Sequence, residues 1–350
     1  MSLVPTVHLP DDLAAALTRR LAATAPAQAS AQVDRLIEKY RGSTPTAAPV
    51  LRDAADAAAY AAYRMPATYA AVRSALAALR DRTGAWTPAT HLDLGGGTGA
   101  ARWAVADAWP AHDSPAGTVL DWSQAALDLG RALAADAVTP AVRATTWTRS
   151  PLSGGPALPP ADLVTVSYVL GELTPADRAA VVAAATAATS PGGVLLVAEP
   201  GTPDGYARII AARDRLVADG LTVLAPCPHS GTCPITGTDW CHFAARVPRS
   251  ALHRQVKGGT LPYEDEKFSY VAATRAAAAA PAPARIVRHP QTRKGQVLLD
   301  LCAASGDLTR TTVSKRQGPL YRAVRDARWG DPWPPRDEQG GASGGSPDGE

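Results

Sequence analysis

The chain has 350 residues, of which 46% are hydrophobic and 19% charged, and its formal net charge is +3. This length and apolar content suffice for one large domain with an insertion or for two domains. No apolar run reaches the roughly 18 residues of a membrane span, and the first residues lack the basic and apolar regions of a signal peptide. We therefore expect a cytoplasmic protein with no membrane partner.

Residues 1–85 predict an N-terminal helical region. Asp11 and Asp12 can cap a helix whose leucines recur at helical spacing, and a second helical stretch covers 51–82. Within that stretch Pro66 starts a new helix, because proline suits a first turn. Neither stretch carries a chemical motif.

Residues 86–202 alternate between strands and helices. The expected strands are 90–94, 118–123, 141–147, 162–170 and 193–199, and the expected helices are 100–109, 124–135, 175–188 and, just beyond, 203–219. Such alternation predicts an α/β fold, a Rossmann-like parallel sheet with helices on both faces. Its ligand should lie at the carboxyl ends of the strands.

A glycine-rich turn follows the first of these strands. It reads D-x-G-x-G-x-G, with Asp93, Gly95, Gly97 and Gly99, and it precedes a helix. Glycine allows the backbone to pass close to a ligand that faces the helix N-terminus. The pattern resembles the first motif of S-adenosylmethionine-dependent methyltransferases; another nucleotide-binding turn or a plain glycine loop is the alternative. The next strand ends at Asp121, which could accept hydrogen bonds from ribose hydroxyls.

The chain has four cysteines. Three of them, Cys227, Cys233 and Cys241, fall within 15 residues, and the fourth, Cys302, lies farther on. In a reducing compartment such clustering favours a metal over a disulfide. Four thiolates can hold one zinc ion or one iron–sulfur cluster. The spacing C-x5-C-x7-C lacks the tight pairs of structural zinc sites and favours a cluster, whose irons separate the ligands; zinc and no metal stay open. His229 and His242 are rival ligands.

The region after residue 202 is expected to contain the metal site. Residues 203–284 would be a cysteine-containing insertion, and strands near 285–289 and 296–302 would finish the sheet. The metal would then join the insertion to the last strand and contribute to folding. Residues 331–350 are rich in Gly, Pro, Ser and acids and predict a disordered tail.

The C-terminal part of the core is strongly basic. Residues 285–330 contain ten Lys or Arg and three Asp, a net charge of +7. This charge indicates a phosphate-rich partner such as nucleic acid, with a solvated basic surface as the alternative.

Several short strings, spread over about residues 50–335, resemble one family. They are YRMPATY at 63–69, the glycine motif at 93–99, EPGTP at 199–203, CPH at 227–229, CP at 233–234, DWCHF at 239–243, DEKFSY at 265–270 and LDLC at 299–302. The resemblance is to the methyltransferase-like small-ribosomal-subunit assembly family of the Rsm22 type, which has mitochondrial and bacterial members.

The resemblance implies a class I methyltransferase fold and a monomer that associates with the small ribosomal subunit and its rRNA. It implies a 4Fe-4S cluster on Cys227, Cys233, Cys241 and Cys302. It implies S-adenosylmethionine contacts at Asp93, Gly95, Gly97, Gly99 and Asp121. The basic segment, including Arg293, Lys294, Lys315 and Arg316, would meet rRNA phosphates, which give affinity rather than sequence specificity.

Catalysis is left open by the sequence. Where methyltransferases acting on base amines carry an Asn/Asp-Pro-Pro-Tyr/Phe loop, residues 167–172 read SYVLGE, in which Tyr168 or Glu172 could assist. If the metal takes every cysteine, none remains as a nucleophile. Three hypotheses result: a cluster-containing assembly factor that binds rRNA, an active rRNA methyltransferase, and a zinc-stabilised small-molecule methyltransferase.

Overall fold

The computed structural model describes residues 4–21, 31–36, 50–110, 114–250, 253–254, 261–276 and 282–335. Its named helices are α1 (Asp11–Leu21), α3 (Ala54–Tyr63), α4 (Met65–Thr83), α5 (Ala100–Ala108), α6 (Gln124–Ala135), α7 (Pro140–Arg143), α8 (Pro175–Ala188), α9 (Pro203–Ala218) and α11 (Gly318–Asp326), with 3-10 turns η2 (Leu170–Glu172) and η3 (Lys315–Gln317). The strands are β1 (Thr90–Leu94), β2 (Ala116–Asp121), β3 (Thr146–Arg149), β4 (Ala161–Ser167), β5 (Thr189–Pro200), β6 (Thr222–Ala225), β7 (Phe243–Pro248), β8 (Tyr263–Thr274), β9 (Ala284–Ile286), β10 (Gln291–Arg293), β11 (Gln296–Ala303), β12 (Leu308–Ser314) and β13 (Pro332–Trp333).

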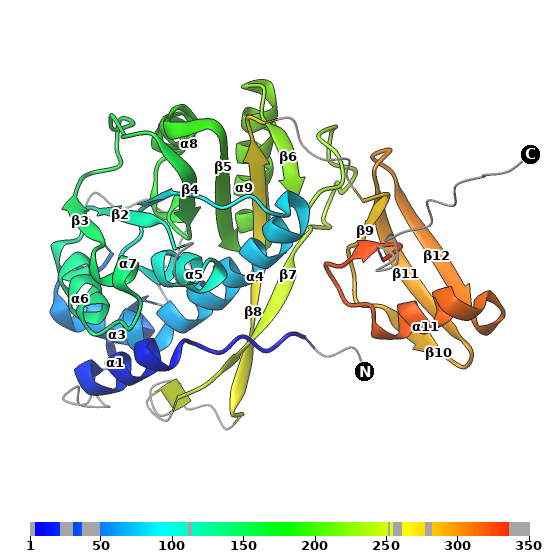
Figure 1. Ribbon diagram of the computed structural model, residues 1–350, viewed down its shortest axis with the longest axis horizontal. Coiled ribbons are helices and arrows are strands. Elements are labelled where there is room, and N and C mark those ends of the chain that lie inside the picture. The colour runs from blue at the N-terminus through cyan, green and yellow to red at the C-terminus, as the bar shows by residue number, and fades with distance from the viewer. Residues whose placement is uncertain are drawn as a thin grey trace, which may run out of the picture.

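The larger sheet has the order β3-β2-β1-β4-β5-β8-β6, with β7 also paired to β8. Strands β1 to β5 pair in parallel, whereas β8 is antiparallel to its neighbours. The strand order reverses between β1 and β4, and a ligand site is expected at such a switch point. Helices cover both faces (Figure 1), so the predicted α/β, Rossmann-like fold of class I methyltransferases is confirmed.

The core has one apolar layer on each face of this sheet. Along β4, Leu163 packs with the α4 and α5 side, and Val164 packs with the α8 and α9 side. Leu196 and Leu195 on β5 alternate in the same way, and all four side chains are fully buried. Burial on both faces explains why these strands are continuous apolar runs rather than alternating ones.

The N-terminal helices agree with the sequence pattern. Helix α1 begins at Asp11, and α4 carries Pro66 in its first turn, as predicted. Asp53 caps α3 by accepting a hydrogen bond from the Asp56 amide at 2.8 Å. Residues 31–36 are helical, and the residues between them and Val50 lie outside the described part of the chain.

One predicted strand of the core begins too early. Residues 141–147 were expected to be extended, but Pro140 opens the short helix α7, and β3 starts only at Thr146. Proline fits the first turn of a helix, and this local preference prevails there. The other predicted core strands and helices are confirmed to within a few residues. The prediction extended β4 to residue 170, whereas it ends at Ser167, and it started β5 at residue 193, whereas it begins at Thr189.

The expectation that strands near 285–289 and 296–302 finish the main sheet is wrong. Strands β9 to β13 form a separate five-stranded sheet, which lies beside β6, β7 and β8 (Figure 1). Strand β11 alternates buried and half-exposed residues, as expected for a sheet covered on one face. The buried run Phe268–Thr274 of β8 fills the place in the main sheet instead.

The supposed insertion 203–284 therefore contains α9 and three strands of the main sheet. The segment between β6 and β7, residues 226–242, is irregular and carries the three clustered cysteines. We call it the cysteine segment.

The second sheet has its own core, made by Ile286, Leu299, Val313, Val324 of α11 and Trp333. Because Trp333 is buried on β13, the predicted disordered tail does not begin at residue 331; residues 336–350 lie outside the described part. None of the helices in the described ranges is long and apolar enough to cross a membrane.

Candidate metal centre and cofactor site

The glycine turn after β1 requires its glycines. Gly95, Gly97 and Gly99 all have positive φ, and a Cβ atom on Gly95 would lie 2.6 Å from the Val169 side chain. A Cβ atom on Gly99 would meet the Trp147 ring at 2.6 Å. Larger residues are therefore disfavoured at Gly95 and Gly99 by both backbone conformation and space, and at Gly97 by conformation.

Asp121 holds this turn in shape. Its Oδ2 accepts the Gly97 amide at 2.9 Å, and its Oδ1 accepts the Ser123 amide at 2.7 Å. Burial raises the pKa of Asp121 to about 6, against the lowering effect of these backbone hydrogen bonds. The side chain is 8% exposed and stands at the carboxyl end of β2 beside the turn.

Asp93 lies beneath the turn and is fully buried. Its Oδ1 accepts the Thr165 hydroxyl at 2.7 Å, and Thr165 is 2.8 Å from His91 Nε2. A Cβ atom on Gly96 would lie 2.3 Å from Asp93 Oδ2. Burial raises the pKa of Asp93 to about 7. Asp93 thus supports the turn from inside the protein.

The loop after β4 is held by two ion-pair networks. Among the non-glycine residues that the structure describes, Tyr168 is the one with a positive φ. Its hydroxyl donates a hydrogen bond to Glu266 Oε1 at 2.9 Å. Glu266 also forms a bidentate pair with Arg64 at 2.9 and 3.0 Å. Deeper in, Glu199 accepts the Leu170 amide at 3.1 Å and Arg208 Nε at 2.6 Å.

These contacts bear on the predicted assisting role of Tyr168. Burial, and next the Glu266 charge, raise the pKa of Tyr168 well above its usual value. The hydroxyl is therefore neutral at physiological pH and is engaged as a donor to Glu266.

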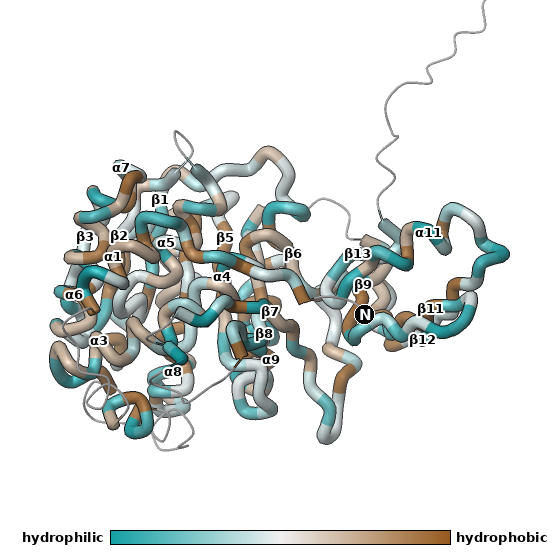
Figure 2. Tube along the Cα trace, turned by 90° about the horizontal axis from the view of Figure 1, so that it is seen from below, coloured by the Kyte–Doolittle hydropathy of each residue, from teal (hydrophilic) through white to brown (hydrophobic). Residues whose placement is uncertain are grey.

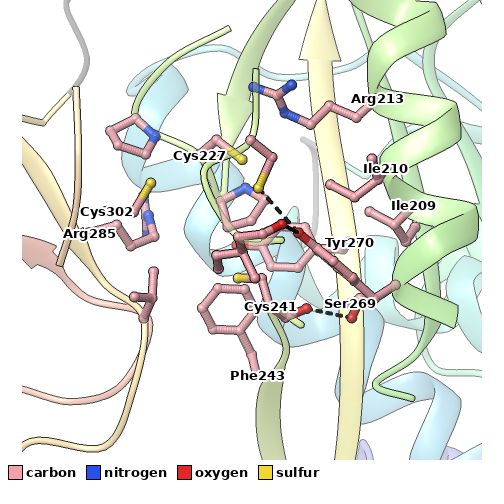
Figure 3. A pocket seen from close by; sticks show the side chains of 16 residues that line it. Ile209, Ile210, Arg213, Cys227, Cys241, Phe243, Ser269, Tyr270, Arg285 and Cys302 are labelled. Carbon is pink, nitrogen blue, oxygen red and sulfur yellow. Dashed lines mark hydrogen bonds between the residues drawn. The ribbon is translucent and has the colours of Figure 1, made fainter. Parts of the chain in front are cut away.

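All four cysteines line a single cavity. The cysteine segment supplies three, and β11 of the second sheet supplies Cys302 (Figure 3). Helix α9 forms another wall with Tyr206, Ile209 and Ile210. The structure thus brings together the four residues selected from the sequence, at the junction of the two sheets.

The thiols are unpaired with one another and affect one another electrostatically. Burial raises the pKa of Cys241 well above its usual value, and burial followed by the charges of Cys227 and Cys233 raises that of Cys302 to about 12. The Tyr206 hydroxyl lies 3.2 Å from Cys233 Sγ. Four thiolates here need a compensating positive charge, which a bound metal centre would provide.

Four thiols are a donor set that can hold either one zinc ion or an iron–sulfur cluster. In the described part of the chain, no three His, Cys, Asp or Glu side chains converge closely enough to hold one metal ion. A cubane carries one thiolate on each of four irons, so its ligands stand farther apart than those of zinc. All-sulfur ligation also agrees with iron–sulfur chemistry.

The two rival histidines lie differently. His229 Nε2 is 3.5 Å from Cys302 Sγ, beside the cysteines. His242 stacks on Trp240 at 5.2 Å and meets Trp329 of the second sheet edge-on at 4.8 Å. Neither histidine belongs to the cavity lining among the described residues.

Among the polar residues of the cavity, sequence reasoning missed Tyr206, Arg213 and Arg285. A signal existed for two of them. Tyr206, Ile209, Ile210 and Arg213 follow the spacing of one helix face, and an arginine on an apolar face indicates a special environment. Arg285 had no such signal, because its position depends on the second sheet.

The four predicted RNA-binding residues lie together and are exposed. Arg293 and Lys294 stand at the β10–β11 turn, Lys315 and Arg316 follow β12, and the Lys315 amide donates to Gly295 O at 3.0 Å. This basic end lies about 20 Å from Cys302 along β11. Figure 2 shows hydrophilic stretches at this outer end of the second sheet.

A sequence model of the family described as mitochondrial small ribosomal subunit Rsm22 matches residues 54–334. The chain belongs to the Rsm22 family. The match includes the glycine turn, all four cysteines and the basic end, so the predicted family membership is confirmed.

Relatives of this Rsm22-family chain include the human mitochondrial ribosome assembly protein METTL17, 30% identical over 295 residues, which cover 78% of this chain and 61% of the human protein. The Rsm22-cox11 tandem protein 1 of Schizosaccharomyces pombe is 26% identical over 185 residues, 41% of this chain and 25% of that one. The chain thus spans only part of the length of these relatives. A solved putative RNA methyltransferase from Pyrococcus horikoshii is similar with a TM-score of 0.40 and 13% identity, covering 70% of this chain and 98% of its own.

Proposed function

We propose that this protein carries a 4Fe-4S cluster on its four cysteines, binds small-subunit rRNA and acts in assembly of the small ribosomal subunit. The observation that carries the proposal is the meeting of four cysteines in one cavity, three from the cysteine segment and one from β11 of the second sheet, in a chain of the Rsm22 family. The relatives' names support the assembly role.

The cluster would be bound by Cys227, Cys233, Cys241 and Cys302. When bound, it supplies metal–thiolate bonds that join the cysteine segment to β11. With all four irons ligated by the protein, no iron is open to a substrate, which supports a structural or sensing role rather than catalysis. One zinc ion bound by the same thiols is the alternative, and metal analysis distinguishes it from the cluster.

The basic end of the second sheet would contact rRNA phosphates. Arg293, Lys294, Lys315 and Arg316 are exposed, and no ion pair in the described part of the chain involves them. Exposed, uncompensated cations at one end of a sheet suit a phosphate backbone. Cytoplasmic placement and a monomeric state stay predictions for this chain; the named relatives are mitochondrial.

The rRNA proposal is tested by binding to small ribosomal subunits at several salt concentrations. The double variant Arg293→Ala with Lys294→Ala should weaken binding and lower the slope of log affinity against log salt by roughly 1.5. The control, Arg131→Ala with Arg215→Ala, removes the same charge from exposed positions on α6 and α9. Equal effects of the two double variants would contradict a contact at the basic end.

S-adenosylmethionine is the second proposed ligand, with methyl transfer to rRNA as the second candidate function. The glycine turn and Asp121 support binding, in which Gly95, Gly97, Gly99 and Asp121 would face the cofactor and the buried Asp93 would hold the turn in place. Tyr168, with its positive φ after β4, favours a functional loop there. Transfer of labelled methyl groups to undermethylated small-subunit rRNA tests the activity; cofactor binding without transfer would favour the binding role.

A further inference from the structure

Two arginines are buried in the cysteine cavity. Arg213 on α9 is 2% exposed, Arg285 on β9 is 4% exposed, and both line the cavity together with the cysteines (Figure 3). Among the described residues of the lining there is no Asp or Glu. A guanidinium keeps its charge when buried, so this cavity holds two positive charges and no carboxylate.

The hydrogen bonds of these arginines leave their charge largely uncompensated. Arg213 donates to the carbonyls of His229 at 3.0 Å and Gly231 at 2.6 Å, and its acidic neighbour Asp214, at 3.4 Å, is 60% exposed. Arg285 donates to the Gly330 carbonyl. In both, Nε is buried and has no hydrogen-bond partner in the described part of the protein.

Burying a cation is costly unless an opposite charge lies close by. The cysteines are the groups in the cavity that can carry that charge. Two buried cations beside four cysteines, with no carboxylate in the described lining, therefore suit an anionic centre held by the cysteines.

From this juxtaposition we propose that Arg213 and Arg285 neutralise the iron–sulfur cluster and set its reduction potential. The inference rests on the proposed function. A cubane with four thiolates has a net negative charge, and one-electron reduction adds a further negative charge without breaking a bond. Two fixed cations stabilise the reduced cluster more than the oxidised one, and so they raise the potential. Tyr206, 3.2 Å from Cys233 Sγ, acts in the same direction as a hydrogen-bond donor to sulfur.

The test is a redox titration of the anaerobically reconstituted full chain, with dithionite as the reductant and the visible spectrum as the readout. Arg213→Met and Arg285→Met should each shift the potential to a more negative value. Arg213→Lys and Arg285→Lys keep the charge and should stay close to the parent. Arg215→Met, on the same helix but 51% exposed, should leave the potential unchanged.

Iron content separates the possible results. A parent chain that binds no iron contradicts the proposed function itself. Fully loaded Met variants with the parent's potential, or Lys variants shifted as far as the Met variants, overturn the role of the two charges. If the Met variants bind no iron, loading of the Lys variants supports the proposal, and failure of both overturns it in favour of a packing role.

Discussion

Two carboxyl groups at the same edge of the sheet have different tasks. Asp121 accepts the Gly97 amide of the glycine turn and the Ser123 amide and is 8% exposed, whereas Asp93 is fully buried beneath the turn. The sequence predicted both as cofactor contacts, because an acid at a strand end is visible in a pattern. Whether its side chain points out or in depends on partners such as Thr165, which no local pattern indicates.

Asp93 should make stability depend on pH. Its folded pKa of about 7 exceeds the unfolded value of about 3.9, so the folded state holds the proton more tightly. Stability from this group is therefore complete below about pH 4 and is lost as pH rises through about 7. Between pH 5 and pH 8 the parent should lose roughly 2 kcal/mol of unfolding free energy through this group, and Asp93→Asn should abolish that part of the loss in urea unfolding. Asp128→Asn, an exposed control, should keep the parent's dependence; an unchanged slope in Asp93→Asn would refute the assignment.

At the scale of elements, two strings that resembled the family but had no assigned task prove to touch. YRMPATY opens α4 and DEKFSY lies on β8, and Arg64 of the first pairs with Glu266 of the second. Their contact secures Tyr168 and the loop after β4. Sequence spacing gave the helix and the loop, but the pair spans 202 residues, so only the folded chain reveals it.

Glu266→Gln should be strongly destabilising. It leaves Arg64 without its charge partner in a setting where the two side chains are only 19% and 11% exposed. Breaking such a pair costs about 3–5 kcal/mol. The neighbouring pair of Asp265 with Arg246 is more exposed, and Asp265→Asn should cost about 1 kcal/mol or less. Similar losses in denaturant unfolding for both variants would contradict a central role of the Arg64 network.

At the scale of the whole molecule, the main error of the sequence prediction was the assignment of strands to sheets. Alternation and apolar runs locate strands, but they do not state which strand pairs with which. The string DEKFSY, followed by a long buried run, belongs to β8 in the main sheet, while Cys302 lies in the second sheet. The cysteines were nevertheless selected correctly as one group, because their clustering is independent of topology.

The second sheet should depend on the metal centre for its attachment. Cys302→Ser should abolish iron binding, lower the melting temperature by roughly 5 °C or more and increase hydrogen exchange in β9 to β12. Cys241→Ser, which removes a ligand from the other side, should have the same effect on iron. Leu308 is the cross-strand partner of Cys302 and is 46% exposed. The control Leu308→Ser should therefore retain iron. Full iron content in either cysteine variant would contradict the ligand assignment.

The iron–sulfur centre is tested most directly by metal analysis, with a visible absorption spectrum, of protein purified without oxygen. We expect about four irons per chain and a brown colour that bleaches in air. One zinc without colour, or no metal at all, would contradict the cluster and return the zinc-stabilised methyltransferase to consideration.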